Sequence, residues 1–137
     1  MIREMNQNDL ASINEIGSLI KENFVKVNYI EDRLKKEYVK VYVYDDSLIK
    51  GFVEVENHFE ITDIINIAVL DRFQHNGIGL KLLDYVIKNT DATKIMLEVN
   101  ENNKKALNFY KKNKFIEINR RKNYYDGADA IIMERSK

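Results

Sequence analysis

Residues 64–85 constrain the fold most, because they form, in order, a strand pattern, a turn with two glycines and a helix pattern. Residues 64–70 are an apolar run rich in β-branched side chains, which predicts a buried strand. Gly77 and Gly79 follow in a polar stretch, and apolar residues then recur at helical spacing as far as Val86. This order aims several free backbone N–H groups and the positive end of a helix dipole at one point. The segment therefore predicts a site for an anion, of which phosphate is the usual example.

The two glycines do not belong to either of the most familiar phosphate loops. The turn lacks a Gly-Lys-Ser/Thr ending, which excludes a Walker-type nucleotide site, and it also lacks the three-glycine dinucleotide fingerprint. It fits instead the pattern Gln/Arg-x-x-Gly-x-Gly/Ala after an apolar strand. A tight turn without any ligand would satisfy the same two glycines, so the pattern needs support from the rest of the chain.

Length and composition indicate one folded domain. The chain has 137 residues, of which 45% are hydrophobic and 32% charged, as in globular proteins and unlike disordered ones. No apolar run approaches the roughly 18 residues of a membrane span, and the N-terminal residues lack an apolar secretory region. We therefore predict a single domain over residues 1–137, located in the cytoplasm and without a membrane partner.

Metal and nucleic-acid partners are not expected. The sequence has no cysteine, which excludes disulfides, thiolate chemistry and cysteine-based metal sites, and only His58 and His75 could supply imidazole. The formal net charge is zero, which gives no support to nucleic-acid binding. Residues 101–137 carry a net charge of +5, however. Such an excess is usually a solvated helix face, but it would also attract a polyanionic ligand.

Hydrophobic periodicity and turn residues predict the other elements. Strands are expected at residues 1–4, 38–44, 48–56, 59–70, 94–99, 115–119 and 128–135. Helices are expected at residues 9–23, 29–37, 78–89 and 103–113, the last capped by Asn102 or Asn103. The helix at 78–89 requires its two flanking strands to run parallel. We predict an α/β fold with a mixed sheet of about seven strands and four helices, in which an antiparallel N-terminal meander precedes a central βαβ unit.

Glu98 is the first candidate for chemistry. Alternation along its strand places Leu97 and Val99 on one face and Met96 and Glu98 on the other. An acidic side chain inside a central parallel strand is unusual, because both faces of such a strand are normally covered. Glu98 could simply reach solvent or pair with a lysine. A partly buried carboxylate could also serve as a general base.

Tyr110 is the second candidate. It lies on the helix predicted at residues 103–113, which packs on the sheet through an apolar stripe. A core aromatic residue with a satisfied hydroxyl is the more usual role of such a tyrosine. If its hydroxyl faced a cleft, it could protonate a leaving group.

Four blocks of sequence belong together. They are Asn66-Ile67-Ala68-Val69, the turn from Gln74 to Gly79, Leu97-Glu98-Val99 with Asn103 and Ala106-Leu107-Asn108-Phe109-Tyr110, and Arg120-Arg121-Lys122-Asn123-Tyr124-Tyr125 with Asp129-Ala130-Ile131-Ile132-Met133. These blocks resemble the GNAT superfamily of acyl-CoA-dependent N-acetyltransferases. The last block, together with the first, is similar to the bacterial ribosomal-protein-alanine N-acetyltransferase branch. The resemblance covers about residues 60–134, in the order and spacing of the family.

The resemblance implies acetyl-CoA as co-substrate, no metal, and central parallel strands that splay apart. The implied residues for the pantetheine arm of the cofactor are Ile67, Ala68, Val69 and Asn103. The implied residues around its pyrophosphate are Gln74, His75, Asn76, Gly77, Ile78, Gly79 and Leu80. Glu98 would take a proton from the substrate ammonium, and Tyr110 would protonate the departing thiolate. Asn66, Tyr124 and Tyr125 would bind the acceptor.

Three departures leave the acceptor open. His75 stands where the family commonly has arginine, residues 23–28 lack the proline and tryptophan usual in that branch, and the turn at 126–128 is short. The first expectation is a protein N-terminal amine, such as a ribosomal-protein alanine. The alternatives are a small amine (a polyamine, an aminoglycoside or an amino acid) or a CoA-binding module without turnover. A monomer and a homodimer are both compatible with the sequence.

Overall fold

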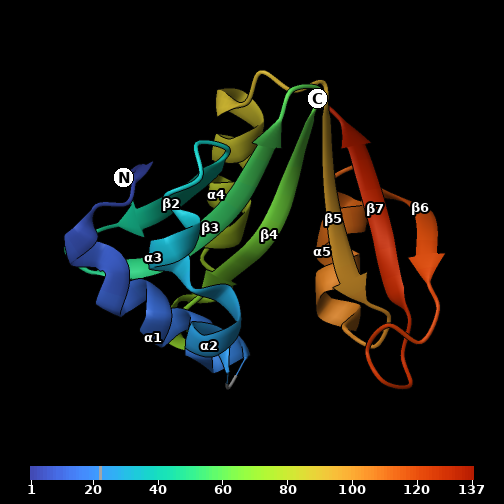
Figure 1. Ribbon diagram of the computed structural model, residues 1–137, viewed down its shortest axis with the longest axis horizontal. Helices are drawn as coiled ribbons and strands as arrows, with labels where there is room; N and C mark the ends of the chain where they lie inside the picture. The colour runs from blue at the N-terminus through green and yellow to red at the C-terminus, as the bar shows by residue number, and fades with distance from the viewer. Residues whose placement is uncertain (22) are drawn as a thin grey trace. The chain divides into compact units, whose positions relative to one another are not determined.

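The computed structural model describes residues 1–21 and 23–137, which form seven strands, five α-helices and two 3-10 helices (Figure 1). The strands are β1 Ile2–Glu4, β2 Val39–Asp45, β3 Ile49–His58, β4 Ile61–Val69, β5 Lys94–Asn100, β6 Ile116–Arg121 and β7 Ala130–Ser136. The helices are η1 Gln7–Asp9, α1 Leu10–Ile20, α2 Phe24–Asn28, α3 Ile30–Arg33, η2 Asp71–Phe73, α4 Ile78–Asn89 and α5 Lys104–Lys112.

The strands form a mixed sheet with the hydrogen-bonded order β1-β2-β3-β4-β5-β7-β6. β1 with β2, β2 with β3, β5 with β7 and β6 with β7 are antiparallel, whereas β4 and β5 are parallel. The parallel ladder joins Ile61 with Lys94, Thr62 with Ile95 and Asp63 with Met96. The predicted α/β class, with an antiparallel meander before a parallel pair, is confirmed.

The internal contacts divide the chain into two compact units. The first comprises Met1–Asn57 and Ile64–Thr90, and the second comprises His58–Asp63 and Asp91–Lys137. β4 contributes its first residues to the second unit and its remaining residues to the first. Among the described residues, no helix combines the length and the apolar character needed to cross a membrane.

The core of the first unit lies between α1–α3 and the inner faces of its strands. It contains Ile13, Ile16, Phe24, Ile30, Val41, Val43, Ile49, Phe52 and Ala68. Phe24 packs edge-on against Phe52, with 5.9 Å between ring centroids. Gly17 on α1 makes room for the Phe24 ring, because a Cβ there would lie 2.4 Å from it. Close packing of α1 against α2 therefore depends on this glycine.

The core of the second unit consists of alternate residues of β5 and β7 and the apolar stripe of α5. Its buried members are Ile95, Leu97, Val99, Ile131, Met133, Leu107, Tyr110 and Phe115. β7 lies between β5 and β6, as Figure 1 shows, and β6 is exposed along its whole length. The alternation predicted for Leu97, Glu98 and Val99 is confirmed, because Leu97 and Val99 are buried and Glu98 is exposed.

The helix predicted at residues 29–37 is shorter in the structure, where α3 covers Ile30–Arg33, and the helix α2 at Phe24–Asn28 before it was not predicted. Two short helices, α2 and α3, meet at Tyr29, whose φ of 45° lies in the left-handed region. A non-glycine residue rarely adopts this conformation, and a helix cannot continue through it. Ile30 and Phe24 are both buried in the core of the first unit. Burial of these two side chains on either side of the break gives a physical reason for it.

Candidate active site

The glycine turn of the first unit has the geometry expected of an anion-binding loop. After β4 and η2, His75 and Gly77 have φ angles of 70° and 77°, and α4 then begins at Ile78. Left-handed residues interleaved with ordinary ones turn successive backbone N–H groups toward a common concavity. Gly77 is the N-cap of α4, and no side chain caps this helix end. The first amides of α4 therefore remain available to a ligand.

The Gln74 side chain holds this turn in place. Its Nε2 atom donates to the Val69 carbonyl oxygen at 3.2 Å and to Asp71 Oδ1 at 3.1 Å. These hydrogen bonds fasten the turn to the end of β4. The predicted cofactor residues Ile67, Ala68 and Val69 and the predicted loop from Gln74 to Leu80 are thus continuous within one unit.

Asn66 belongs to a buried polar network that the sequence did not indicate. Its Nδ2 atom donates to Glu54 Oε1 at 2.8 Å, and Glu54 is completely buried. Arg33 of α3 pairs with Glu54 and, through its second nitrogen, with Glu56 Oε2 at 2.7 Å. The Asn66 amide group therefore bonds to a neighbouring strand, and its predicted acceptor contact stays a prediction.

Glu98 lies in a cluster with Arg121, Tyr124 and Tyr125, which we call the Glu98 cluster. Arg121 Nε is 3.1 Å from Glu98 Oε1. The Arg121 guanidinium carbon lies 5.4 Å from the centre of the Tyr124 ring, and this ring meets Tyr125 edge-on at 5.1 Å. Burial, and then the negative charge of Glu98, raise the pKa of the Tyr125 phenol. The structure thus brings the predicted base and both predicted acceptor-binding tyrosines together.

The turn between β6 and β7 fixes the two tyrosines. Asp129 Oδ1 accepts from the Asn123 backbone N–H at 3.0 Å, and the Tyr125 N–H donates to the Ala128 carbonyl at 2.9 Å. Asn123, Asp126 and Gly127 all have positive φ angles. The short turn that departs from the family pattern is therefore a closely hydrogen-bonded structure.

Asn103 and Tyr110 lie on or beside α5. Asn103 caps the helix, because its Oδ1 accepts from the Ala106 N–H at 3.2 Å, which confirms one of the two predicted caps. Tyr110 is buried, and its ring packs edge-on against Phe109 and Phe115, at 5.2 Å and 5.4 Å. Burial raises the pKa of its phenol. Within the described part of the chain, Tyr110 has no hydrogen bond or ring contact with the Glu98 cluster.

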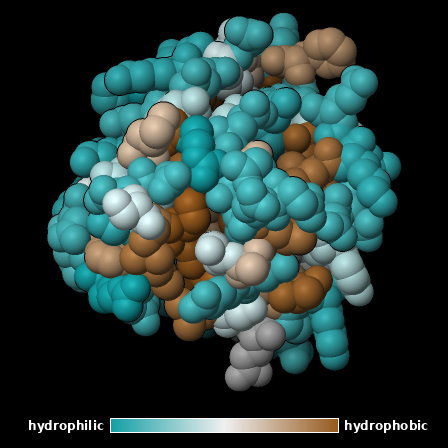
Figure 2. Space-filling view, turned by 90° about the vertical axis from the view of Figure 1, so that its left-hand side faces the viewer, coloured by the Kyte–Doolittle hydropathy of each residue, from teal (hydrophilic) through white to brown (hydrophobic). Residues whose placement is uncertain are grey.

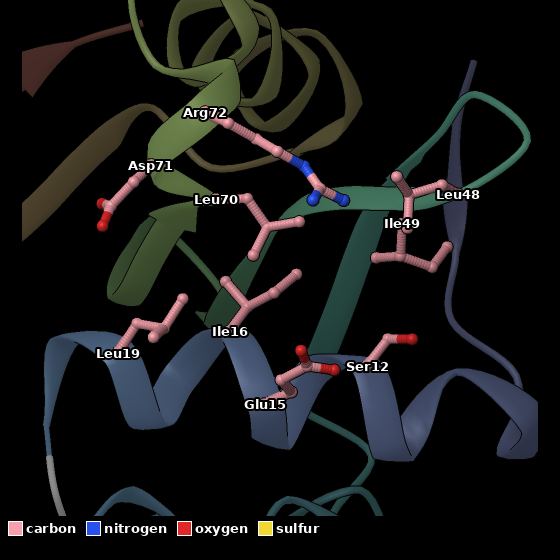
Figure 3. Close-up of a pocket in the computed structure, with 9 residues that line it drawn as sticks. All are labelled: Ser12, Glu15, Ile16, Leu19, Leu48, Ile49, Leu70, Asp71 and Arg72. Carbon is pink, nitrogen blue, oxygen red and sulfur yellow. The ribbon is translucent and has the colours of Figure 1, made fainter.

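A pocket of about 290 Å³ in the first unit is separate from all of these residues. It is lined by Ser12, Glu15, Ile16, Leu19, Leu48, Ile49, Leu70, Asp71 and Arg72. Figure 3 shows Arg72 extending toward Leu48 above α1, whereas the Asp71 carboxylate points away. Figure 2, a view from the side of α1, shows apolar surface in patches among hydrophilic side chains. None of the predicted site residues lines this pocket.

Sequence reasoning missed two site residues, Arg121 and Glu54. Arg121 belongs to the last of the four blocks that resemble the family, but the sequence alone indicated no role for it. Its position opposite Ala130 depends on the pairing of β6 with β7, which no local pattern specifies. Glu54 could have been noticed as a carboxylate between Val53 and Val55, next to the apolar run that Phe52 begins.

The mixed sheet and the glycine turn between β4 and α4, where no side chain caps the helix, define an α/β protein with a candidate anion site. Comparisons with known proteins identify its family. A family model described as the acetyltransferase (GNAT) domain matches residues 6–137. The chain therefore belongs to the GNAT acetyltransferase family, as the sequence resemblance implied.

Individual relatives add detail to this assignment. An N-alpha-acetyltransferase of Sulfurisphaera tokodaii is 39% identical over 75 residues, which cover 51% of this chain and 45% of that protein. The ribosomal-protein-S18-alanine N-acetyltransferase of Escherichia coli has a similar crystal structure, with a TM-score of 0.86, 25% identity and coverage of 99% and 92%. An aminoglycoside 6′-N-acetyltransferase complexed with coenzyme A shares the fold alone, with a TM-score of 0.85, 14% identity and coverage of 99% and 96%. The chain spans about half the length of the curated relatives it matches.

Proposed function

We propose that this protein is an acetyl-CoA-dependent N-acetyltransferase, that residues 1–137 act as one domain, and that the acceptor is a protein N-terminal amine. The observation that carries the proposal is the uncapped start of α4 behind a turn with two left-handed residues, in a chain that matches the GNAT model over residues 6–137. A cytoplasmic location stays a prediction from the sequence.

The residues of the first unit suit the anionic part of coenzyme A. Backbone N–H groups from His75 to Leu80 would hold the pyrophosphate at the positive end of α4. Gln74 would act indirectly, because its side chain fastens the turn to Val69. Backbone groups of Ile67, Ala68 and Val69 would bind the pantetheine arm. The cofactor contact of Asn103 stays a prediction from the resemblance, and its side-chain oxygen caps α5.

The Glu98 cluster would receive the acceptor. Acetyl-CoA supplies the acetyl group as a thioester. Glu98 would accept a proton from the acceptor ammonium, directly or through water, so that the free amine can attack. Tyr124 and Tyr125 would flank the acceptor backbone, and the acceptor contact of Asn66 stays a prediction from the resemblance. The Tyr110 phenol is protonated at neutral pH with its ordinary pKa of about 10, and burial raises that pKa further, so it has the form that a proton donor to the thiolate needs.

A protein N-terminus is favoured over a polycationic small amine by the surroundings of Glu98. A peptide can extend along the exposed tyrosine pair, which a small amine does not need. Three nearby carboxylates, those of Glu101, Glu117 and Asp129, also already lie in ion pairs with Arg120. A small-molecule acceptor and a non-catalytic CoA-binding module are the outcomes against which the proposal is tested.

The test is substitution of Glu98 by glutamine, with turnover of an alanine-initiated peptide as the readout. We expect kcat/KM to fall about 100-fold, the usual scale for loss of a general base. Glu134→Gln is the matched control, because Glu134 pairs with Met96 two residues along β5 and so lies on the same sheet face. Near-normal turnover of Glu98→Gln would remove Glu98 from this role.

A further inference from the structure

Arg121 reaches Glu98 by crossing the strand between them. Arg121 on β6 is opposite Ala130 on β7, and Ala130 is opposite Asn100 on β5. Glu98 lies two residues before Asn100, so both charged side chains are on one sheet face. The crossing point is Ala130, the smallest chiral side chain, and the guanidinium ends 3.1 Å from the Glu98 carboxylate. The fold thus places an internal cation at the position that an acceptor ammonium must reach.

The pair of Arg121 and Glu98 is well suited to being displaced. The two side chains retain 55% and 32% of their exposure, and ion pairs so exposed to water change equilibrium constants only a few-fold. An acceptor ammonium can therefore replace the guanidinium beside Glu98. The displaced guanidinium stays tethered nearby, where the face of the Tyr124 ring already attracts it.

We propose that Arg121 makes the acceptor site selective for amines with a single positive charge. This inference rests on the proposed acetyltransferase function and names its acceptor class more closely. One ammonium takes the place of the guanidinium beside the Glu98 carboxylate, and the guanidinium remains tethered nearby. A second ammonium on the same acceptor meets the tethered guanidinium and is repelled.

Three neighbouring acidic residues already take part in ion pairs of their own. Arg120 lies 2.9 Å from Glu117, 3.7 Å from Glu101 and 3.5 Å from Asp129. Lys122 also approaches Asp129, at 3.6 Å. The negative charge of these three carboxylates is therefore partly compensated by Arg120, which they share, and by Lys122. The acceptor class that fits is a peptide N-terminus followed by uncharged residues, and not a polyamine.

The experiment measures kcat/KM for two peptides, one beginning Ala-Gln and its twin beginning Ala-Lys, in the wild type and three variants. Two charges about 7 Å apart at an effective dielectric constant of about 50 repel by roughly fivefold in an equilibrium constant. Arg121→Gln should therefore raise kcat/KM for the lysine peptide about fivefold relative to that for the glutamine peptide. The change should lie in the KM for the peptide and not in the KM for acetyl-CoA. Arg121→Lys should keep the wild-type ratio.

Lys122→Gln is the matched control, because it removes the same charge from the adjacent residue, which is paired with Asp129. It should leave the ratio of the two peptides unchanged. If both peptides are acetylated and the ratio of their kcat/KM values is the same in the wild type and in Arg121→Gln, this inference alone is overturned. Transfer to neither peptide by the wild type would overturn the proposed function as well, so the two failures are distinguishable. If Lys122→Gln changed the ratio of the two peptides as much as Arg121→Gln does, the effect would come from net charge alone. That result would also overturn the inference.

Discussion

Substitution of Arg33 by methionine should destabilise the first unit severely. Arg33 on α3 pairs with Glu54 on β3, whose side chain is completely inaccessible to solvent, and Asn66 on β4 donates to the same carboxylate. Removing the cation leaves a buried charge without its ionic partner, which typically costs 3–5 kcal/mol. We expect the lower end, about 3 kcal/mol, because the Asn66 hydrogen bond persists and the Arg33 side chain is itself 28% exposed.

Urea unfolding followed by circular dichroism measures this effect. For a denaturant slope of about 1.5 kcal/mol/M, the midpoint should fall by about 2 M. Lys35→Met is the control, because Lys35 and Asp32 form an exposed pair at 3.4 Å that contributes at most about 0.5 kcal/mol. Arg33→Met combined with Glu54→Gln should recover most of the loss, since the buried charge is then absent. A loss below about 1 kcal/mol in Arg33→Met alone would refute the reasoning.

Three further predictions concern the glycine turn, Tyr110 and Asp129. Gly77→Ala should cost about 1 kcal/mol of stability, because φ is 77° while no atom lies within 4 Å of the added methyl group. It should also raise the KM for acetyl-CoA. Gly127→Ala, at a residue with φ of 105°, should instead change the KM for the peptide. The raised pKa of Tyr110 implies stability that is complete below about pH 10 and declines as the pH rises further. Wild-type protein should therefore lose stability between about pH 10 and about pH 11 in urea titrations, and Tyr110→Phe should lose less. The Asn123 N–H holds the pKa of Asp129 below its usual range. The stabilisation by Asp129 should therefore be present above about pH 4 and be lost as the pH falls through the folded-state pKa. Faster hydrogen exchange at Asn123 would report this loss, and Asp129→Asn should remove the pH dependence.

Local signals in the sequence specified much of the fold. The helix predicted at residues 78–89 has the same bounds as α4, because its start follows a glycine turn and its apolar residues keep one helical stripe. The cap at Asn103 was also predictable, since a short polar side chain before an amphipathic segment satisfies the first amides. Both features depend only on residues close together in the chain.

Features that depend on distant residues were not predictable in the same way. The break at Tyr29 comes with burial of Phe24 and Ile30 in a core built from four other elements. The burial of Glu54 and the crossing of Arg121 over Ala130 require strand pairing and register, which the pattern of a single strand does not contain. The residues of the candidate site could therefore be predicted one by one, but the charge that faces Glu98 could not.

Acetyl transfer to a peptide is the most direct test of the central claim. Purified protein, acetyl-CoA and an alanine-initiated peptide are incubated together, and mass spectrometry locates the acetyl group while a thiol reagent measures free coenzyme A. The account predicts acetylation at the peptide α-amine with one coenzyme A released for each product. Binding of acetyl-CoA without an acetylated product from this peptide, or from a panel of small amines, would contradict it.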